Sequence, residues 1–148
     1  MAPPLLEQSI DVRVPRDFVW RQRTDVRTWH DPPAQFRLPG PFQDGAVGKT
    51  VVPGEPPVTW RVRNVRAPEA FTVEVPVEDA VVAFEWTFQA LGPSDTRMTQ
   101  RVAITGEHAA AYEDGVRSAF GATLPQGMAR IARSLEDEFR KTTDRSHE

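Results

Sequence analysis

The feature that most constrains this chain is a long region in which apolar and polar side chains alternate residue by residue. The alternation runs over residues 58–63, 71–75, 82–90 and 97–104, and a period of two is typical of strands that bury one face. A shorter strand-like segment, 47–52, precedes them, and prolines and glycines lie in between as turn signals. The region therefore predicts an antiparallel meander with one apolar face and one charged face.

A strand and a short helix are predicted before this region. Residues 10–14 alternate between apolar and charged side chains, and Pro15 ends the strand. Because proline suits the first positions of a helix, we expect a helix over 16–24. The pair Pro32-Pro33 cannot continue it, since proline has no N–H and restricts the residue before it.

The period changes after Gly106, where apolar residues recur every three or four positions as they do on amphipathic helices. The two stripes are Tyr112, Val116 and Phe120, followed by Leu124, Met128, Ile131 and Leu135. Gly121 and Pro125 interrupt the run, and Thr123 with Gln126 matches a capping box at the start of the second helix. A last helix of ~18 residues would be ~27 Å long, enough to cross a sheet. We expect the polar end, residues 143–148, to fray.

These elements predict a single α+β domain over residues 1–148, in which a curved antiparallel sheet of six to seven strands wraps around the long C-terminal helix, with short helices after the first strand. A curved sheet crossed by a helix leaves a gap, and small-molecule sites are mostly apolar with a few placed polar groups. The residues that we expect to face this gap are Trp60, Phe71, Phe84, Trp86, Phe88, Met98, Gln100, Tyr112, Phe120, Leu124, Met128 and Ile131. Gln100 stands out because a buried amide needs hydrogen-bond partners.

Composition excludes several classes of protein. The 148 residues include no cysteine and three histidines, which argues against disulfide scaffolds, thiolate metal sites and a cysteine nucleophile. Neither His30 nor His108 has partners at metal-ligand spacing, so we expect no metal and no cofactor. The net charge is −3, and acidic residues lie on the same sheet face as the arginines, so we expect cross-strand ion pairs rather than nucleic-acid binding.

The sequence shows no signal peptide, and its longest apolar run is far too short for a membrane span. We therefore expect a cytoplasmic protein that does not bind membranes, as a monomer or homodimer. The tripeptide Gly48-Lys49-Thr50 resembles the end of a phosphate loop, but position 43 is glutamine where that motif has glycine, and a strand rather than a helix follows. We reject a phosphate site there.

The order of elements and several local segments resemble the START-like superfamily, also called SRPBCC, which has the helix-grip fold. The matching segments are 9–20 (SIDVRVPRDFVW), Trp29, 42–49 (FQDGAVGK), 84–88 (FEWTF) and 96–106 (TRMTQRVAITG). The superfamily includes polyketide cyclases and dehydrases, pollen-allergen-type lipid binders and activators of a heat-shock-protein ATPase. The resemblance implies a ligand cavity between the sheet and the C-terminal helix, with Trp29 and His30 at its mouth.

In bacterial members of the superfamily, the positions of Trp86 and Gln100 are often histidines that face the cavity. Tryptophan and glutamine can stack on a ligand and hydrogen-bond it, but neither exchanges a proton near neutral pH. The sequence therefore favours a protein that binds a hydrophobic, aromatic or lipid-like molecule. Two alternatives stay open: a cyclase or dehydrase acting in the same cavity, and a chaperone-activator type of interaction module. The enzyme would need an inward proton carrier, for which the candidates are Tyr112, His30, Glu74 and Glu107.

Overall fold

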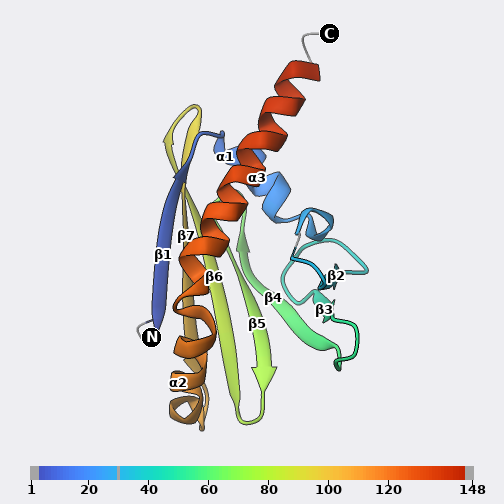
Figure 1. Cartoon of the computed structure of the whole chain (residues 1–148), viewed down its shortest axis with the longest axis vertical. Helices are drawn as coiled ribbons and strands as arrows, with labels where there is room; N and C mark the ends of the chain where they lie inside the picture. Colours follow the sequence, from blue (N-terminus) through green and yellow to red (C-terminus); the bar gives the residue numbers. More distant parts are fainter. Residues whose placement is uncertain (1–3, 30, 146–148) are drawn as a thin grey trace.

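One antiparallel sheet and the helices that cover its inner face make up the part of the chain that the computed structural model describes, residues 4–29 and 31–145 (Figure 1). The strands are β1 (Leu6–Val12), β2 (Gln35–Arg37), β3 (Val47–Val51), β4 (Val58–Arg66), β5 (Ala70–Val77), β6 (Ala80–Gly92) and β7 (Asp95–Thr105). The helices are α1 (Arg16–Arg23), the 3-10 helix η1 (Val26–Thr28), α2 (Ala109–Phe120) and α3 (Thr123–Arg145). The predicted α+β class and helix-grip arrangement are confirmed.

The sheet is the predicted meander, and the first strand forms one of its two edges. Its spatial order is β1-β7-β6-β5-β4-β3-β2, so each strand from β2 to β6 pairs with the next in sequence, and β1 pairs with β7. The register places Trp86 directly opposite Gln100, and Phe88 opposite Met98. Because side chains alternate between faces, this register aligns the large residues of neighbouring strands in rows on one face.

The outer face of the sheet carries the expected ion pairs. Arg97 donates to Asp11 at 2.8 Å, and Arg101 lies between Glu7 at 3.0 Å and Glu85 at 3.2 Å. These pairs join β1, β7 and β6 across the strands, so arginine on this face is matched by carboxylates, as the sequence predicted.

The short helices expected after the first strand are α1 and the 3-10 helix η1. The strand β2 was not predicted, because it lies after the pair Pro32-Pro33, where the sequence indicated only a loop. β2 pairs with β3 and forms an edge of the sheet. The predicted capping box is wrong, because Thr123 lies inside α3 and its hydroxyl donates to the carbonyl of Ala119 at 3.1 Å. α3 has 23 residues rather than about 18 and continues into the polar end of the chain, to Arg145.

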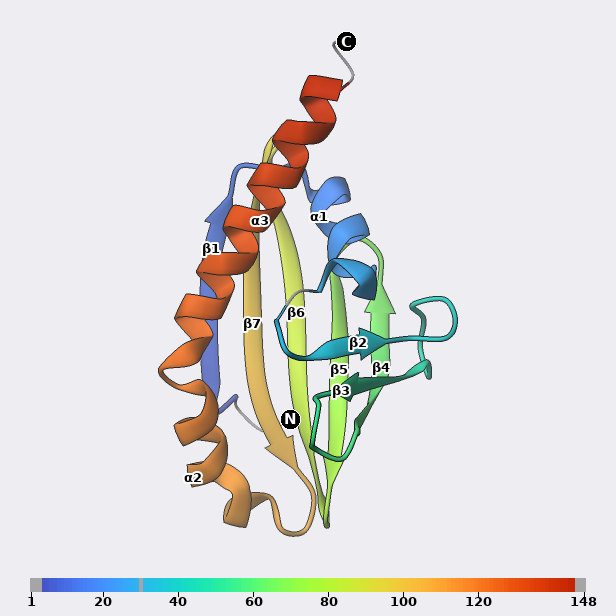
Figure 2. The same ribbon diagram turned by 45° about the vertical axis from the view of Figure 1, so that its right-hand side comes forward.

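α3 crosses the inner face of the sheet, and its C-terminal end extends beyond the strands (Figures 1 and 2). In the second half of α3, a Glu136 carboxylate oxygen accepts from the backbone N–H of Arg13 at 3.0 Å. The ring of Phe139 meets the edge of Phe18 in α1, with centroids 5.1 Å apart. These contacts hold the second half of α3 against β1 and α1. Figure 2 shows the first half facing β2 and β3 across the sheet.

Candidate functional site

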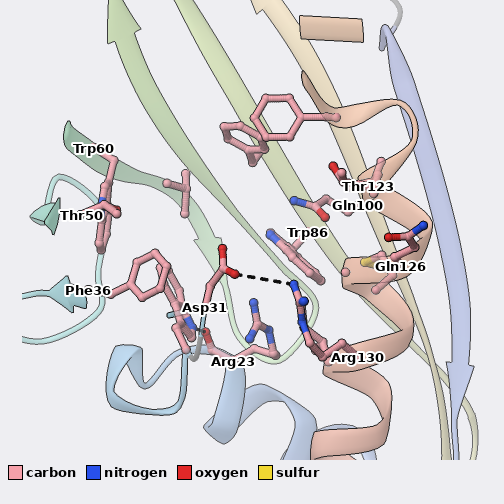
Figure 3. Close-up of a pocket in the computed structure, with 18 of the residues that line it drawn as sticks. Arg23, Asp31, Phe36, Thr50, Trp60, Trp86, Gln100, Thr123, Gln126 and Arg130 are labelled. Carbon is pink, nitrogen blue, oxygen red and sulfur yellow. Dashed lines mark hydrogen bonds and ion pairs between the residues drawn. The ribbon is translucent and has the colours of Figure 1, made fainter. Parts of the chain in front are cut away.

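A cavity of about 640 Å³ lies between the inner face of the sheet and the first half of α3 (Figure 3). Nine of the residues that the sequence placed at the cavity or its mouth line it: Trp29, Trp60, Phe84, Trp86, Gln100, Phe120, Leu124, Met128 and Ile131. Most of the wall is therefore apolar and aromatic.

The cavity is bordered by three buried clusters of the core. One cluster packs under α1 and contributes Trp86 and Met128, a second packs under α2 and contributes Leu124, and a third packs around Trp60. Phe84 and Phe120 close the second cluster with an edge-to-face contact at 5.3 Å. Because each cluster presents aromatic or aliphatic surface to the same space, a ligand there would contact all three.

Trp60 forms one side wall and is held from behind by β3. Gly48 lies opposite Trp60 in the strand register, and a Cβ at Gly48 would overlap the indole ring. Two residues on, the hydroxyl of Thr50 accepts from Trp60 Nε1 at 3.1 Å. The tripeptide that resembled a phosphate loop therefore lies on a strand, and its glycine and threonine position a tryptophan.

Trp29 extends this wall toward the opening. Its ring lies 5.5 Å from that of Trp60 and 5.5 Å from that of Phe36 in β2. The indole N–H of Trp29 donates to the backbone carbonyl of Arg23 at 3.0 Å, which ties the wall to the end of α1. Nothing is described for His30, the other residue predicted at the mouth, which lies outside the described residues.

Gln100 is the polar residue of the sheet wall. It is half-buried beside Trp86, and no hydrogen bond of its side-chain amide is formed with any residue that the structure describes. An amide carries two donors and an acceptor. Gln100 is therefore available to orient a ligand.

Arg23, which the sequence reasoning missed, contributes a half-buried cation. It is the last residue of α1, and its guanidinium lies 4.7 Å from the ring centroid of Trp86 and 5.6 Å from that of Trp29. Its Nε is sealed from solvent, with no hydrogen-bond partner among residues 4–29 and 31–145. Burial lowers the pKa of Arg23 to about 10, so the side chain is still a cation at neutral pH. The sequence feature that could have indicated its inward position is that Arg23 follows the buried Val19 by four residues, on the same face of the helix.

Polar side chains also lie along α3 and the opposite loop. Arg130 and Asp31 form an ion pair at 3.8 Å, and their side chains are 62% and 66% exposed. Thr123 and Gln126 lie on α3 like Arg130 and also line the cavity (Figure 3). An exposed pair at this distance is weak, so both groups are free to exchange partners when a ligand enters.

Four predicted cavity residues lie elsewhere. Phe71, Phe88 and Met98 are fully packed in the cluster under α1, because their part of the sheet is covered by α1 and the second half of α3. Tyr112 packs on the cluster under α2, and its hydroxyl donates to the carbonyl of Glu78 at 2.8 Å.

The proton carriers considered from the sequence are likewise absent from the described cavity wall. Glu74 pairs with Arg63 on the outer face at 3.3 Å, and Glu107 is exposed before α2. Within the described part of the chain, no group of three or more histidine, cysteine or acidic residues could hold a metal ion. In that part no helix is both long and apolar enough to cross a membrane.

Comparison with solved structures shows what this fold is similar to. Protein Ms6760 from Mycobacterium smegmatis has 15% identity and a TM-score of 0.61, over 93% of this chain and 91% of that one. Norcoclaurine synthase from Thalictrum flavum, solved with dopamine and hydroxybenzaldehyde, has 12% identity and a TM-score of 0.67, over 92% and 86%. The di-domain ARO/CYC BexL of the BE-7585A biosynthetic pathway has 17% identity and a TM-score of 0.68, over 88% and 46%.

At these identities the similarities show a shared fold, and this chain spans about half the length of BexL. A comparison with curated protein sequences gives no significant match. The family described as polyketide cyclase/dehydrase and lipid transport matches residues 4–136, nearly the whole chain. By that match, and with the sheet, helix and cavity described above, the chain belongs to the polyketide cyclase/dehydrase and lipid transport family.

Proposed function

We propose that this protein binds a small, largely apolar, ring-containing molecule in the cavity between the sheet and α3. The observation that carries the proposal is the cavity itself. Its volume of about 640 Å³ is in the range of roughly 300–1,000 Å³ typical of small-molecule sites. Six of its nineteen lining residues are tryptophan or phenylalanine, which provide large and rigid contact surfaces.

The arrangement of the walls suits a flat ring system. Trp60 and Trp29 form one wall, and Phe84 and Phe120 form another, while Gln100 beside Trp86 can pair with an oxygen or nitrogen of the ligand. The norcoclaurine synthase of similar fold was solved with two ring-containing molecules, dopamine and hydroxybenzaldehyde. That example supports the same class of ligand here.

The test is a titration with the anthraquinone emodin, the flavonoid naringenin and the fatty acid oleate, followed by tryptophan fluorescence. We expect at least one ring compound to change the emission, because three of the four tryptophans line the cavity. Val75→Phe fills part of the cavity and should weaken that binding at least tenfold. Val81→Phe makes the same change on the outer face of the sheet and should leave the affinity unchanged. If no compound binds, or if both variants bind like the original protein, the proposal is wrong.

A second candidate is a cyclase or dehydrase acting in the same cavity, which the family match favours. Arg23 and Asp31 both line the cavity, so one could polarise a ketone oxygen while the other carries a proton. The cavity would fold the chain and bring its reacting carbons together. Under this reading a poly-β-ketone substrate is converted to a cyclised or dehydrated product, and Asp31→Asn abolishes the conversion while substrate still binds.

A further inference from the structure

Arg23 is a charged group that the fold leaves unpaired. Three arginines on the outer sheet face, Arg63, Arg97 and Arg101, have carboxylate partners at 2.8–3.3 Å. Arg23 has neither a carboxylate partner nor a hydrogen-bond acceptor among the described residues, although its Nε is sealed from solvent. Taking a cation out of water without an anion is costly, so a site that keeps one has a use for its charge.

The two neighbouring indoles keep this cation in place. The guanidinium stacks over Trp86 at 4.7 Å and lies 5.6 Å from Trp29, so cation–π attraction offsets part of the cost of burial. These rings cover faces of the guanidinium and supply no hydrogen-bond acceptor. Arg23 also forms part of the cavity wall. Its hydrogen-bonding capacity therefore remains available to a molecule in the cavity.

No nearby acid in the cavity wall neutralises Arg23. Asp31 is the acidic residue of the described wall, and it pairs with Arg130 rather than with Arg23. Arg23, Arg130 and Asp31 together leave this end of the cavity with one excess positive charge. Figure 3 shows both arginines directed toward the same end, below the aromatic walls.

From this arrangement we infer that the ligand carries an anionic oxygen group, such as a carboxylate or sulfonate, and that Arg23 binds that group at the α1 end of the cavity. The inference rests on the proposed function, because it adds an acidic group to the ring-containing ligand. The rings then extend toward Trp60, Phe84 and Phe120, and Gln100 pairs with a second polar atom. A neighbouring hollow of about 100 Å³ between α1 and α3 also borders Arg23.

The test uses two fluorescent probes that share one ring body. N-phenyl-1-naphthylamine is neutral, and 8-anilinonaphthalene-1-sulfonate is the same molecule with a sulfonate. We expect both to bind, and the sulfonate to bind at least tenfold more tightly. Hydrogen bonds to charged groups are the strong ones, so Arg23→Gln should remove most of that advantage while the affinity for the neutral probe stays within twofold.

Two further variants separate charge from structure. Arg23→Lys retains the charge without the planar fork, and it should retain part of the preference for the sulfonate. Arg133→Gln, an exposed arginine on α3 outside the cavity wall, should change neither affinity. Urea unfolding of each variant shows whether the fold is intact. If Arg23→Gln does not fold, the inference is still tested by the affinities of the two probes for the original protein and for Arg23→Lys.

Each outcome has one reading. If neither probe binds, the proposed function fails, and the inference fails with it. If both probes bind equally in the original protein, the cavity takes apolar rings without selecting an acid, so the inference alone is overturned. If Arg23→Gln weakens both probes equally, Arg23 only supports the cavity wall, and the inference is again overturned.

Discussion

At the scale of single residues, the site depends on a glycine that makes room for a tryptophan. Gly48 has no side chain, so the Trp60 indole lies flat against β3, and Thr50 on the same face of that strand accepts its N–H. This packing leaves the other side of the indole facing the cavity. The shape of the cavity wall is thus set by a residue that does not itself line it.

We predict that Gly48→Ala destabilises the fold by about 1–3 kcal/mol, as overpacking in a core does, because the new methyl group overlaps the Trp60 ring. The midpoint of urea unfolding measures the loss. In a Trp60→Leu background the same substitution should cost much less, because the two residues are in contact. Gly40→Ala, where a Cβ meets nothing within 4 Å, is the control. Equal stability of Gly48→Ala and the original protein would refute the packing argument.

At the scale of elements, the turn from α1 through η1 positions both Arg23 and Trp29. Asp25 caps η1 by accepting from the backbone N–H of Arg27 at 3.0 Å, and it also pairs with the Arg27 guanidinium at 2.8 Å. Thr28 then donates to the carbonyl of Gln22 at 2.6 Å. These bonds fix a segment that has little core of its own, and they set where the charged end of the cavity meets its aromatic wall.

The cap gives a pH-dependent prediction. The hydrogen bond from Arg27 lowers the pKa of Asp25 below its ordinary value of 3.8. The stabilisation is therefore complete above about pH 4 and is lost as the pH falls through the lower pKa of the folded state. Asp25→Ala should cost about 0.5–2 kcal/mol at pH 7, as other N-cap losses do, and the difference from the original protein should shrink at pH 3.

Urea unfolding at both pH values measures this difference. Asp114→Ala, which removes an exposed carboxylate on α2, should differ from the original protein in free energy of unfolding by the same amount at pH 7 and at pH 3. A cost of Asp25→Ala that is the same at both pH values would show that the carboxylate charge does not contribute to the cap.

At the scale of the whole molecule, the cavity divides the core. The cluster under α1 is closed by α1 and the second half of α3, whereas the first half of α3 together with Trp29, Asp31 and Phe36 covers the cavity. Segments with fewer buried contacts open at lower free energy than the core. A bound ring would supply the contacts that both parts of this cover lack.

We therefore predict that N-phenyl-1-naphthylamine slows amide hydrogen exchange in residues 123–131 and 31–36 by at least severalfold. The central strands β6 and β7, which are paired on both sides, should change little at the same probe concentration. Mass spectrometry of exchanged peptides measures both. In Val75→Phe the probe should have no such effect. Uniform slowing over the whole chain would instead indicate that the probe stabilises only the global fold.

Much of this molecule could be predicted from the sequence, for identifiable physical reasons. Alternation around Trp86 and Gln100 gave the inward face of β6 and β7, because side-chain direction on a strand depends only on sequence parity. Alternation does not show how far along a strand the covering helices reach, so Phe88 and Met98 were placed at the cavity although they lie in the packed core. Arg23 was missed because a charged residue on a short helix ordinarily faces water.

The division of the cavity between elements has a consequence for how its specificity could change. The rings of the walls come from the sheet, from the end of α2 and from Trp29 after η1, whereas the unpaired charge comes from the last residue of α1. Preference for ligand shape and preference for ligand charge are therefore encoded at separate places in the chain. A replacement at position 23 would convert selection for acids into selection for neutral molecules while the walls kept their form, so relatives of one shape could diverge toward chemically different ligands by changes at that end alone.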